Sequence, residues 1–205
     1  MKKTIALVIC IILLFTNAYA NQTYIDELKD YKIFEGDENG MRLEDNITKA
    51  EFAKVLSCSM GLEMNYSLND DPFKDVPYTH WACGYIRYAV AVALLDFTED
   101  YYFYPDSHIT HNDAIKSILT ILGYNELAKS AGYAETAKKL GIIKSYDNSL
   151  NEFAKRQDIV TLIANALDVP VMQQTGFGKE AEFVIMDGTN NLPLITLRTM
   201  LGETE

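Results

Sequence analysis

The sequence predicts a mainly α-helical fold, built from three helix-loop-helix repeats and followed by a short β-hairpin-like tail. Two observations lead to this prediction: an internal repeat, and an apolar stripe at helical spacing in each copy of it. The chain has 205 residues and a formal net charge of -11. It is long enough to bury one substantial core. Its acidity argues against a nucleic-acid partner, because a phosphate backbone requires a basic surface.

The N-terminus has the pattern of a cleavable export signal. Two lysines precede an almost wholly apolar run at residues 5–15, which is short for a membrane span. Ala18 and Ala20 then supply the small residues that signal peptidase reads. We therefore expect a signal peptide at residues 1–20, a secreted mature chain that begins at Asn21, and no transmembrane anchor in that mature chain.

The internal repeat becomes visible when Thr48 is aligned with Thr110, which superposes two long segments without a gap. A third copy fits when Lys155 is set against the two threonines. Gly61 and Gly123 fall at the expected helix ends, where a left-handed cap favours glycine. Each copy contains one predicted buried stripe, formed by Phe52, Val55, Leu56 and Met60, by Ile115, Ile118, Leu119 and Leu122, and by Ile159, Leu162, Ile163 and Leu167.

Each of these helices has a recognisable start. Thr48 with Glu51, and Thr110 with Asp113, have the spacing of a capping box, in which a hydroxyl and an acid three residues later satisfy each other's backbone N–H groups. The third copy has no hydroxyl at Lys155, so its helix start should fray the most.

A second helical stretch precedes each capped helix, at residues 24–34, 80–95 and 131–143. The loops between the two helices share apolar anchors, with Met41 aligned to Phe103. One helix-loop-helix unit cannot bury its stripe alone, so three units must pack around a common core. The repeats are expected at residues 21–66, 67–126 and 127–169.

Several short motifs keep their mutual spacing across a whole helix-loop-helix unit. They are Phe73-Lys74-Asp75-Val76-Pro77, His80-Trp81-Ala82 and Phe103-Tyr104-Pro105-Asp106, together with Ile-Thr-Lys-Ala-Glu-Phe-Ala at residues 47–53. These motifs resemble the S-layer homology domain, and the resemblance extends over residues 24–169. It implies a pseudo-threefold bundle of three repeats with grooves between neighbours. It also implies non-covalent attachment to a bacterial cell wall or S-layer through a secondary cell-wall polysaccharide, anionic and often carrying ketal-linked pyruvate.

The resemblance also indicates binding residues. In that family each capped helix begins with Thr-Arg-Ala-Glu, whose arginine suits a carboxylate on the glycan, because a guanidinium grips it through two parallel hydrogen bonds. The arginine position falls on Lys49, His111 and Arg156, which are therefore the predicted glycan-binding residues. We expect them at solvent-facing helix starts, where exposed N–H donors add to the attraction. Histidine is mostly neutral at pH 7, which weakens the second site. Trp81 is expected to pack in the core instead of stacking on a sugar.

Other site chemistry is weakly represented. His80 with Cys83, and His108 with His111, stand three residues apart, but a structural zinc site needs four ligands in compact pairs. The chain has no nucleophile elbow, zinc-protease motif or phosphate-binding glycine loop, so it predicts no enzyme, no metal and no cofactor. Cys58 and Cys83 remain after cleavage, and whether they pair stays open.

The tail at residues 170–205 changes character after Pro170. A β-type run at residues 183–186 and a second apolar run at residues 194–197 flank a turn-forming segment, which predicts a hairpin. A lone hairpin is marginal in water, so it should pack on the third repeat or begin a further domain.

Three functions remain open at this point. The first is a wall-binding module. The second is a surface-layer or surface-assembly protein that binds other surface-layer proteins and no glycan. The third is an enzyme acting on wall polymers, although none of the plentiful acids belongs to a catalytic motif.

Overall fold

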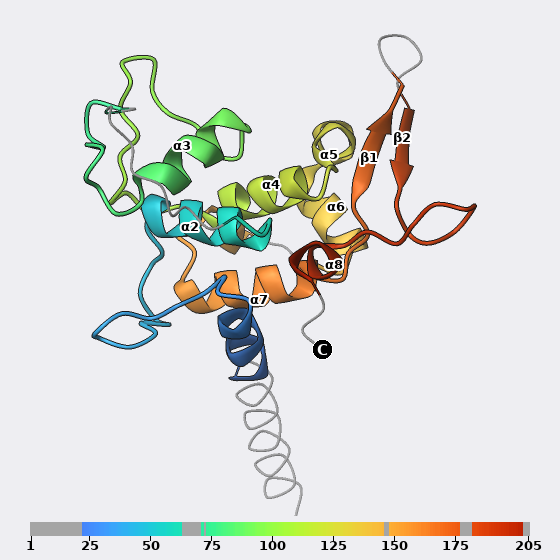
Figure 1. Ribbon diagram of the computed structural model, residues 1–205, viewed down its shortest axis with the longest axis horizontal. Helices are drawn as coiled ribbons and strands as arrows, with labels where there is room; N and C mark the ends of the chain where they lie inside the picture. Colours follow the sequence, from blue (N-terminus) through green and yellow to red (C-terminus); the bar gives the residue numbers. More distant parts are fainter. Residues whose placement is uncertain (1–21, 63–70, 72, 146–147, 177–181, 203–205) are drawn as a thin grey trace, which may run out of the picture.

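The computed structural model describes residues 22–62, 71, 73–145, 148–176 and 182–202 (Figure 1). The export signal expected at residues 1–20 lies outside this part of the chain. The fold is mainly helical with one small two-stranded sheet, as the sequence predicts. Within the described ranges, no helix has both the length and the apolar character that a membrane crossing requires.

The three capped helices run side by side through the middle of the molecule (Figure 1). Thr48 Oγ1 accepts a hydrogen bond from the Glu51 N–H at 3.2 Å, and the Glu51 carboxylate accepts one from the Thr48 N–H at 2.9 Å. Thr110 and Asp113 form the same capping box, with distances of 3.2 and 3.1 Å. These helices, each of 11 residues, are α2 (Lys49–Ser59), α4 (His111–Ile121) and α7 (Arg156–Ala166).

The helix that precedes each capped helix is shorter than predicted. Residues 22–30 are helical in the first repeat, and α3 spans Cys83–Ala91 in the second. In the third repeat the predicted helix at 131–143 is replaced by α5 (Asn125–Ala131) and α6 (Tyr133–Lys139). Gly132, with φ of 95°, separates the two because this left-handed backbone conformation interrupts the helix.

All three of these leading helices end in the same turn. The amide of Ile33 donates to the carbonyl of Leu28 at 2.8 Å, a bond that spans five residues and marks a left-handed cap. Leu94 and Ala89, and Ile142 and Ala137, form the equivalent bonds at 2.8 and 2.9 Å. The left-handed position in each turn is Lys32, Ala93 and Gly141 in the three repeats.

The short segments just before the capped helices pair with one another. Isolated antiparallel bridges join Asn46 to Lys155, Thr48 to His108, and Thr110 to Phe153. Each bridge connects a different pair of repeats, so the three segments form a closed pseudo-threefold junction. At its centre lie the buried residues Ile47, Ile109 and Ala154.

The predicted apolar stripes form most of the core between the helices. Of the twelve stripe residues, all but Met60 are buried, and Met60 packs against the core from its edge. The loop before α7 in the third repeat contains a short 3₁₀ helix, η1 (Asn148–Asn151). Cys58 and Cys83 are both buried thiols.

The tail forms a hairpin, but not from the two predicted runs. Strand β2 (Glu182–Ile185) pairs antiparallel with β1 (Met172–Thr175), which the sequence analysis did not predict. The run at 194–197 contributes one bridge, between Asp187 and Leu194, and then enters helix α8 (Leu197–Leu201). The reason is local, because Thr196 caps α8 by accepting a hydrogen bond from the Thr199 N–H at 3.1 Å.

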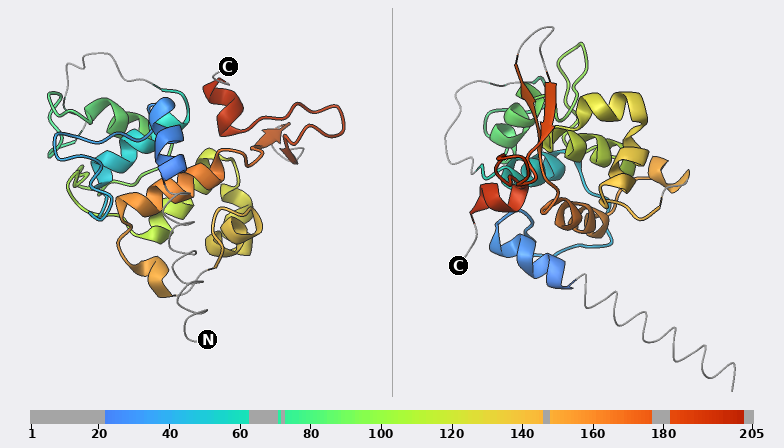
Figure 2. Two further views of the ribbon diagram at one scale, coloured as in Figure 1. Left: turned by 90° about the horizontal axis from the view of Figure 1, so that it is seen from below. Right: turned by 90° about the vertical axis from the view of Figure 1, so that its right-hand side faces the viewer.

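The tail packs beside the helices and joins the ends of the repeats (Figure 2). The Met172 N–H donates to the Leu122 carbonyl at the end of α4, at 2.8 Å. The Arg198 guanidinium forms two hydrogen bonds, of 2.6 and 2.9 Å, with the Asp168 carboxylate beyond α7, and also pairs with Glu27 of the first helix. The tail therefore fastens the first repeat to the third.

Candidate functional site

Two of the predicted binding residues occupy the same place in different repeats. Arg156, the first residue of α7, donates from Nε to the Met41 carbonyl and from Nη2 to the Glu35 carbonyl, each at 2.9 Å. Lys49, the first residue of α2, donates from Nζ to the carbonyls of Phe103, at 2.9 Å, and Asp96. Met41 and Phe103 are the aligned loop anchors. Each cation thus crosses from its own repeat to the equivalent loop of the next one.

The third predicted residue makes a shorter crossing. His111 lies with Nδ1 3.1 Å from the Glu152 carbonyl and with Nε2 3.1 Å from the Asp158 carboxylate. The histidine side chain is shorter than lysine or arginine. It does not reach the end of α6 in the third repeat and contacts the segment around the start of α7 instead. The three crossings run from repeat 1 to 2, from 2 to 3 and from 3 to 1, which closes a ring.

The expectation that these residues face solvent is wrong for Arg156, which is 4% exposed, while Lys49 and His111 are partly buried. The prediction that the backbone N–H groups at these helix starts are free to bind a ligand is also wrong. The backbone amides of Lys49, His111 and Arg156 donate to the carbonyls of Ser107, Glu152 and Asp45, at 2.7, 3.1 and 2.9 Å. The loop of the neighbouring repeat docks on each helix start and supplies the acceptors that the helix itself lacks.

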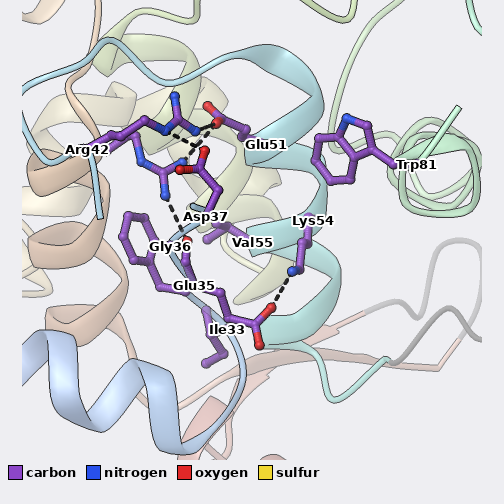
Figure 3. Close-up of a pocket in the computed structure, with 11 residues that line it drawn as sticks. Ile33, Glu35, Gly36, Asp37, Arg42, Glu51, Lys54, Val55 and Trp81 are labelled. Carbon is purple, nitrogen blue, oxygen red and sulfur yellow. Dashed lines mark hydrogen bonds and ion pairs between the residues drawn. The ribbon is translucent and has the colours of Figure 1, made fainter. Parts of the chain in front are cut away.

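A groove with a volume of about 400 Å³ lies where the first and third repeats meet (Figure 3). The loop of the first repeat forms its floor, α2 forms one wall, and Arg156 reaches in from α7. Trp81 stands at the opposite edge and comes from the second repeat. The lining residues are Ile33, Phe34, Glu35, Gly36, Asp37, Arg42, Glu51, Lys54, Val55, Trp81 and Arg156.

The groove contains three cations and three acids. Arg42 pairs with Asp37 at 2.8 Å and with Glu51, while Arg156 Nη1 lies 3.1 Å from Glu51. Burial alone would raise the pKa of Glu51, but the Thr48 N–H and the two guanidinium groups outweigh it and lower the pKa overall. The carboxylate of Glu51 is therefore charged at neutral pH, and its partners are held in place.

Arg156 is the most enclosed of these cations. Burial lowers its pKa, while Glu51 acts in the opposite direction. A guanidinium nevertheless stays charged in proteins. Its carbon lies 4.6 Å from the centre of the Phe34 ring, so the ring face covers the cation on one side.

Lys54 and Trp81 lie at the open side of the groove. Lys54 Nζ pairs with Glu35 at 2.5 Å, and the lysine side chain is still 27% exposed to solvent. Trp81 is 58% exposed, so the prediction that it packs in the core is wrong. Helix α3 begins only at Cys83, which leaves Trp81 in the preceding turn, off the buried face that Ala82 and Ile86 form.

The junction of the first and second repeats contains a smaller groove of about 220 Å³. Lys49 takes the place of Arg156 there, and Lys116 pairs with Asp96 at 3.3 Å, as Lys54 pairs with Glu35. The repeat alignment places Thr161 at the corresponding position of α7. Lys54 and Lys116 also align when Thr48 is set against Thr110, and this recurrence is the signal in the sequence that could have identified them. Nothing in the sequence pointed to Arg42, whose backbone is left-handed with φ of 46°.

The S-layer homology domain profile matches residues 16–53 and 72–115. The chain belongs to the S-layer homology domain family. The two matches cover parts of the first two S-layer homology repeats as far as the start of each capped helix. The third repeat lies outside the matched residues and is assigned from its geometry, since α7 has the same length, start and inter-repeat crossing as α2 and α4.

Three curated relatives resemble this S-layer homology protein over most of its length. A "Cell surface protein" of Thermoanaerobacter kivui is 29% identical over 137 residues, which is 65% of this chain and 18% of the relative. A "Middle cell wall protein" of Brevibacillus brevis is 30% identical over 152 residues, 72% of this chain and 14% of the relative. A "Surface layer protein" of Brevibacillus choshinensis is 28% identical over 149 residues, which is 70% of this chain and 13% of the relative. The aligned region spans less than a fifth of each relative.

Proposed function

We propose that the repeats attach this protein to the bacterial cell wall by binding an anionic secondary cell-wall polysaccharide in the grooves between repeats. Family membership and the named relatives place the protein outside the cell, at the cell wall, in a structural role as an anchoring module. The proposal adds the ligand and the residues that bind it. It rests on one observation: the larger inter-repeat groove brings cations from the first and third repeats to an exposed tryptophan from the second repeat.

The residues of this groove have different roles in the proposal. Arg156 is buried and bonded to two carbonyls, so it positions the loop of the first repeat and adds positive charge beneath the ligand. Lys54 and Arg42 retain exposed surface, with side chains 27% and 28% exposed, and they can approach a carboxylate directly. A charge-assisted contact of this kind is stronger than a neutral hydrogen bond.

Trp81 supplies the apolar part of the site. Its exposed ring lies against the His80 ring, with centroids 5.8 Å apart and planes 28° apart, which limits its rotation. A sugar ring can pack on such a face while its acidic substituent contacts the cations. Ketal-linked pyruvate suits this arrangement, because it places a methyl group and a carboxylate on one carbon.

Lys49 and His111 are proposed to serve the other two junctions less strongly. Burial lowers the pKa of Lys49, although Asp96 and Asp75 act to raise it, and its ammonium is already bonded to two carbonyls. His111 already contacts the Asp158 carboxylate, which competes with an incoming anion. The first and third repeats therefore form the main site in this proposal.

One observation favours the surface-assembly alternative. Each cation of the large groove already has an acidic partner within the protein, so an incoming carboxylate must compete with Glu35, Asp37 or Glu51. A groove neutralised in this way also suits a protein partner, for instance another surface-layer protein.

Sedimentation with purified wall sacculi separates the two functions. The test compares the parent with Lys54→Gln plus Trp81→Ala, two changes at exposed positions that should leave the fold intact. Loss of one charge-assisted contact and one stacking face should weaken binding roughly ten- to hundredfold. Lys129→Gln on α5, whose side chain is 55% exposed in a surface pair with Glu126, is the matched control and should bind as the parent does.

Two further conditions complete this test. Stripping the secondary polymer from the sacculi should abolish the difference between the parent and the double variant, and raised salt should weaken binding of the parent to intact sacculi, because exposed charges are screened. If the double variant sediments as well as the parent with intact sacculi, the groove is not the binding site and the assembly alternative takes its place.

A further inference from the structure

A surface of different chemistry lies on the loop that precedes α4. Four aromatic side chains are exposed there: Phe97 at 42%, Tyr101 at 59%, Tyr102 at 36% and Tyr104 at 54%. We call these four residues the aromatic platform. None of them lines the large groove described above. Exposed single aromatics are common, but a group of four within eight residues of sequence is a concentrated patch.

The rings of the platform rest on one another and on a buried ring. Phe73 is buried, with its centroid 5.2 Å from that of Phe97, and Phe97 lies 5.6 Å from Tyr101. Tyr102 and Tyr104 are stacked, with centroids 5.8 Å apart and planes 20° apart. These separations are typical of aromatic pairs that restrict each other's orientation. The platform is therefore an ordered array of rings.

The backbone below the rings is held in an unfavourable conformation. Tyr101 and Tyr104 have φ of 64° and 59°, in the left-handed region that bulky residues rarely adopt. Hydrogen bonds enforce it: the Asp75 carboxylate accepts from the amides of Phe103 and Tyr104 at 2.8 and 2.7 Å, and the Lys74 amide donates to the Tyr101 carbonyl at 2.8 Å. The same conformation recurs at Arg42, which aligns with Tyr104, so it belongs to the loop of the repeat, and here it fixes the backbone that carries the exposed rings.

The charges around the platform limit what can bind to it. Glu99 and Asp100 are exposed within the same loop, whereas the Asp96 carboxylate just before it is paired with Lys116. Lys74 lies over Tyr102, with Nζ 5.2 Å from the ring centre. The acids outnumber this lysine, so a polyanion is repelled from the rim of the platform.

We propose that the aromatic platform binds uncharged pyranose rings of a polysaccharide. A pyranose has apolar C–H faces and a rim of hydroxyls, which match the faces and the hydroxyl edges of tyrosines. The two ring pairs offer several faces, which can contact several sugar units of one glycan and favour a polysaccharide over a single small molecule. The platform therefore takes a neutral stretch of glycan, whereas the groove is proposed to take an anionic one. The inference does not depend on the groove.

The left-handed tyrosines allow a clean test, since glycine adopts this backbone conformation readily. The double substitution Tyr101→Gly plus Tyr104→Gly removes two rings and relieves the backbone at once, so thermal unfolding should occur at the same temperature as in the parent or higher. Isothermal titration with a β-1,4-linked N-acetylglucosamine hexamer then measures the affinity. We expect the double variant to bind at least about tenfold more weakly than the parent, from the loss of two ring contacts.

Phe183→Ala is the matched control, because Phe183 is 45% exposed on β2, in the hairpin on the opposite side of the molecule (Figure 1). This variant should bind the hexamer as the parent does. A galacturonate hexamer, which the groove is proposed to attract, should bind the parent and the double glycine variant equally well. The proposal is wrong if the parent binds no neutral hexamer, if the double variant binds it as tightly as the parent, or if the acidic hexamer binds more tightly to the platform.

Two further binding experiments identify the natural source of the neutral glycan. Binding to sacculi stripped of secondary polymer, lost in the double glycine variant, assigns the platform to the glycan strands of peptidoglycan. Binding to the released polymer, with the same dependence on the two tyrosines, assigns it to a neutral stretch of that polymer. Equal retention of the parent and the double variant in both arms contradicts the proposal.

Discussion

Arg156 Nη1 lies 3.1 Å from Glu51 Oε1, an ion pair between the first turns of α7 and α2. The two residues are more than 100 positions apart in the chain, yet they complete the last of the three crossings between repeats. Because both side chains are largely enclosed, at 5% and 15% exposure, the pair is part of the structure that holds the ring closed.

Arg156→Ala should therefore lower the stability of the whole protein. It removes one of the two guanidinium partners of Glu51 and leaves the carbonyls of Met41 and Glu35 without their donor, at a cost of about 3–5 kcal/mol. The neighbouring Lys155→Ala removes only an exposed pair with Glu44, which should change the stability little. Urea denaturation of the two variants tests the contrast. Similar small losses in both would show that Arg156 does not hold the ring together.

Much of this ring could be predicted from the sequence, but its burial could not. The spacing of Thr48 and Thr110 from the acids three residues later predicts the helix caps. The 3.6-residue period of apolar side chains predicts the buried stripe of each helix. The burial of Arg156 depends on contacts with the loop residues Met41 and Glu35, which belong to another repeat. The same reason explains Trp81, because its exposure depends on where α3 begins. Contacts distant in sequence leave no local pattern.

Glu51 should make stability depend on pH in the acidic range. Its pKa is lower in the folded protein than the usual value of about 4.3 for an unfolded chain. Its contribution is therefore complete above that pH and is lost as the pH falls through the folded-state pKa. Glu51→Gln should be clearly less stable than the parent at pH 7, and the gap should shrink below about pH 4. Urea denaturation midpoints of the parent and the variant at pH 7 and below about pH 4 measure this difference in stability. A difference that does not change with pH would contradict the lowered pKa of Glu51.

The capping boxes predict a ranking among the three helix starts. Thr48→Ala and Thr110→Ala each remove a hydroxyl that accepts from a backbone N–H, which should cost about 0.5–2 kcal/mol. Lys155 has no hydroxyl to lose, and the Asp158 carboxylate accepts from its backbone N–H at 2.9 Å regardless of the side chain. Chemical denaturation should show that Lys155→Ala costs the least. Equal losses at all three positions would mean that the alignment of the repeats is displaced.

Gly61 and Gly123 occupy equivalent left-handed caps but should tolerate alanine very differently. At Gly61, φ is 75° and an added Cβ would come no closer than 3.8 Å to the Met200 carbonyl oxygen. Only the left-handed conformation then opposes alanine, and the lower freedom of alanine in the unfolded chain offsets part of it, so the net cost is about 0.5–1 kcal/mol. At Gly123, the added Cβ would lie 1.8 Å from the Met172 carbonyl oxygen, so β1 must move. Gly123→Ala should cost several kcal/mol and increase amide exchange in the tail. Matching stabilities and exchange rates would show that the tail does not pack on α4.

The turns that end the leading helices yield a stabilising substitution. The left-handed position is glycine in the third repeat, at Gly141, but alanine in the second, where Ala93 has φ of 57°. A left-handed alanine costs about 1–2 kcal/mol, of which the greater freedom of glycine in the unfolded chain offsets about 0.4–1 kcal/mol. Ala93→Gly should therefore stabilise the protein by about 0.5–1 kcal/mol. Ala91→Gly, the same change at the last residue of α3, should instead destabilise it by up to about 1 kcal/mol, because that position is helical. Thermal and urea denaturation of the two variants should give shifts of opposite sign. If both variants lose stability, Ala93 is not left-handed in solution, and the second repeat does not share the helix end that the other two repeats have.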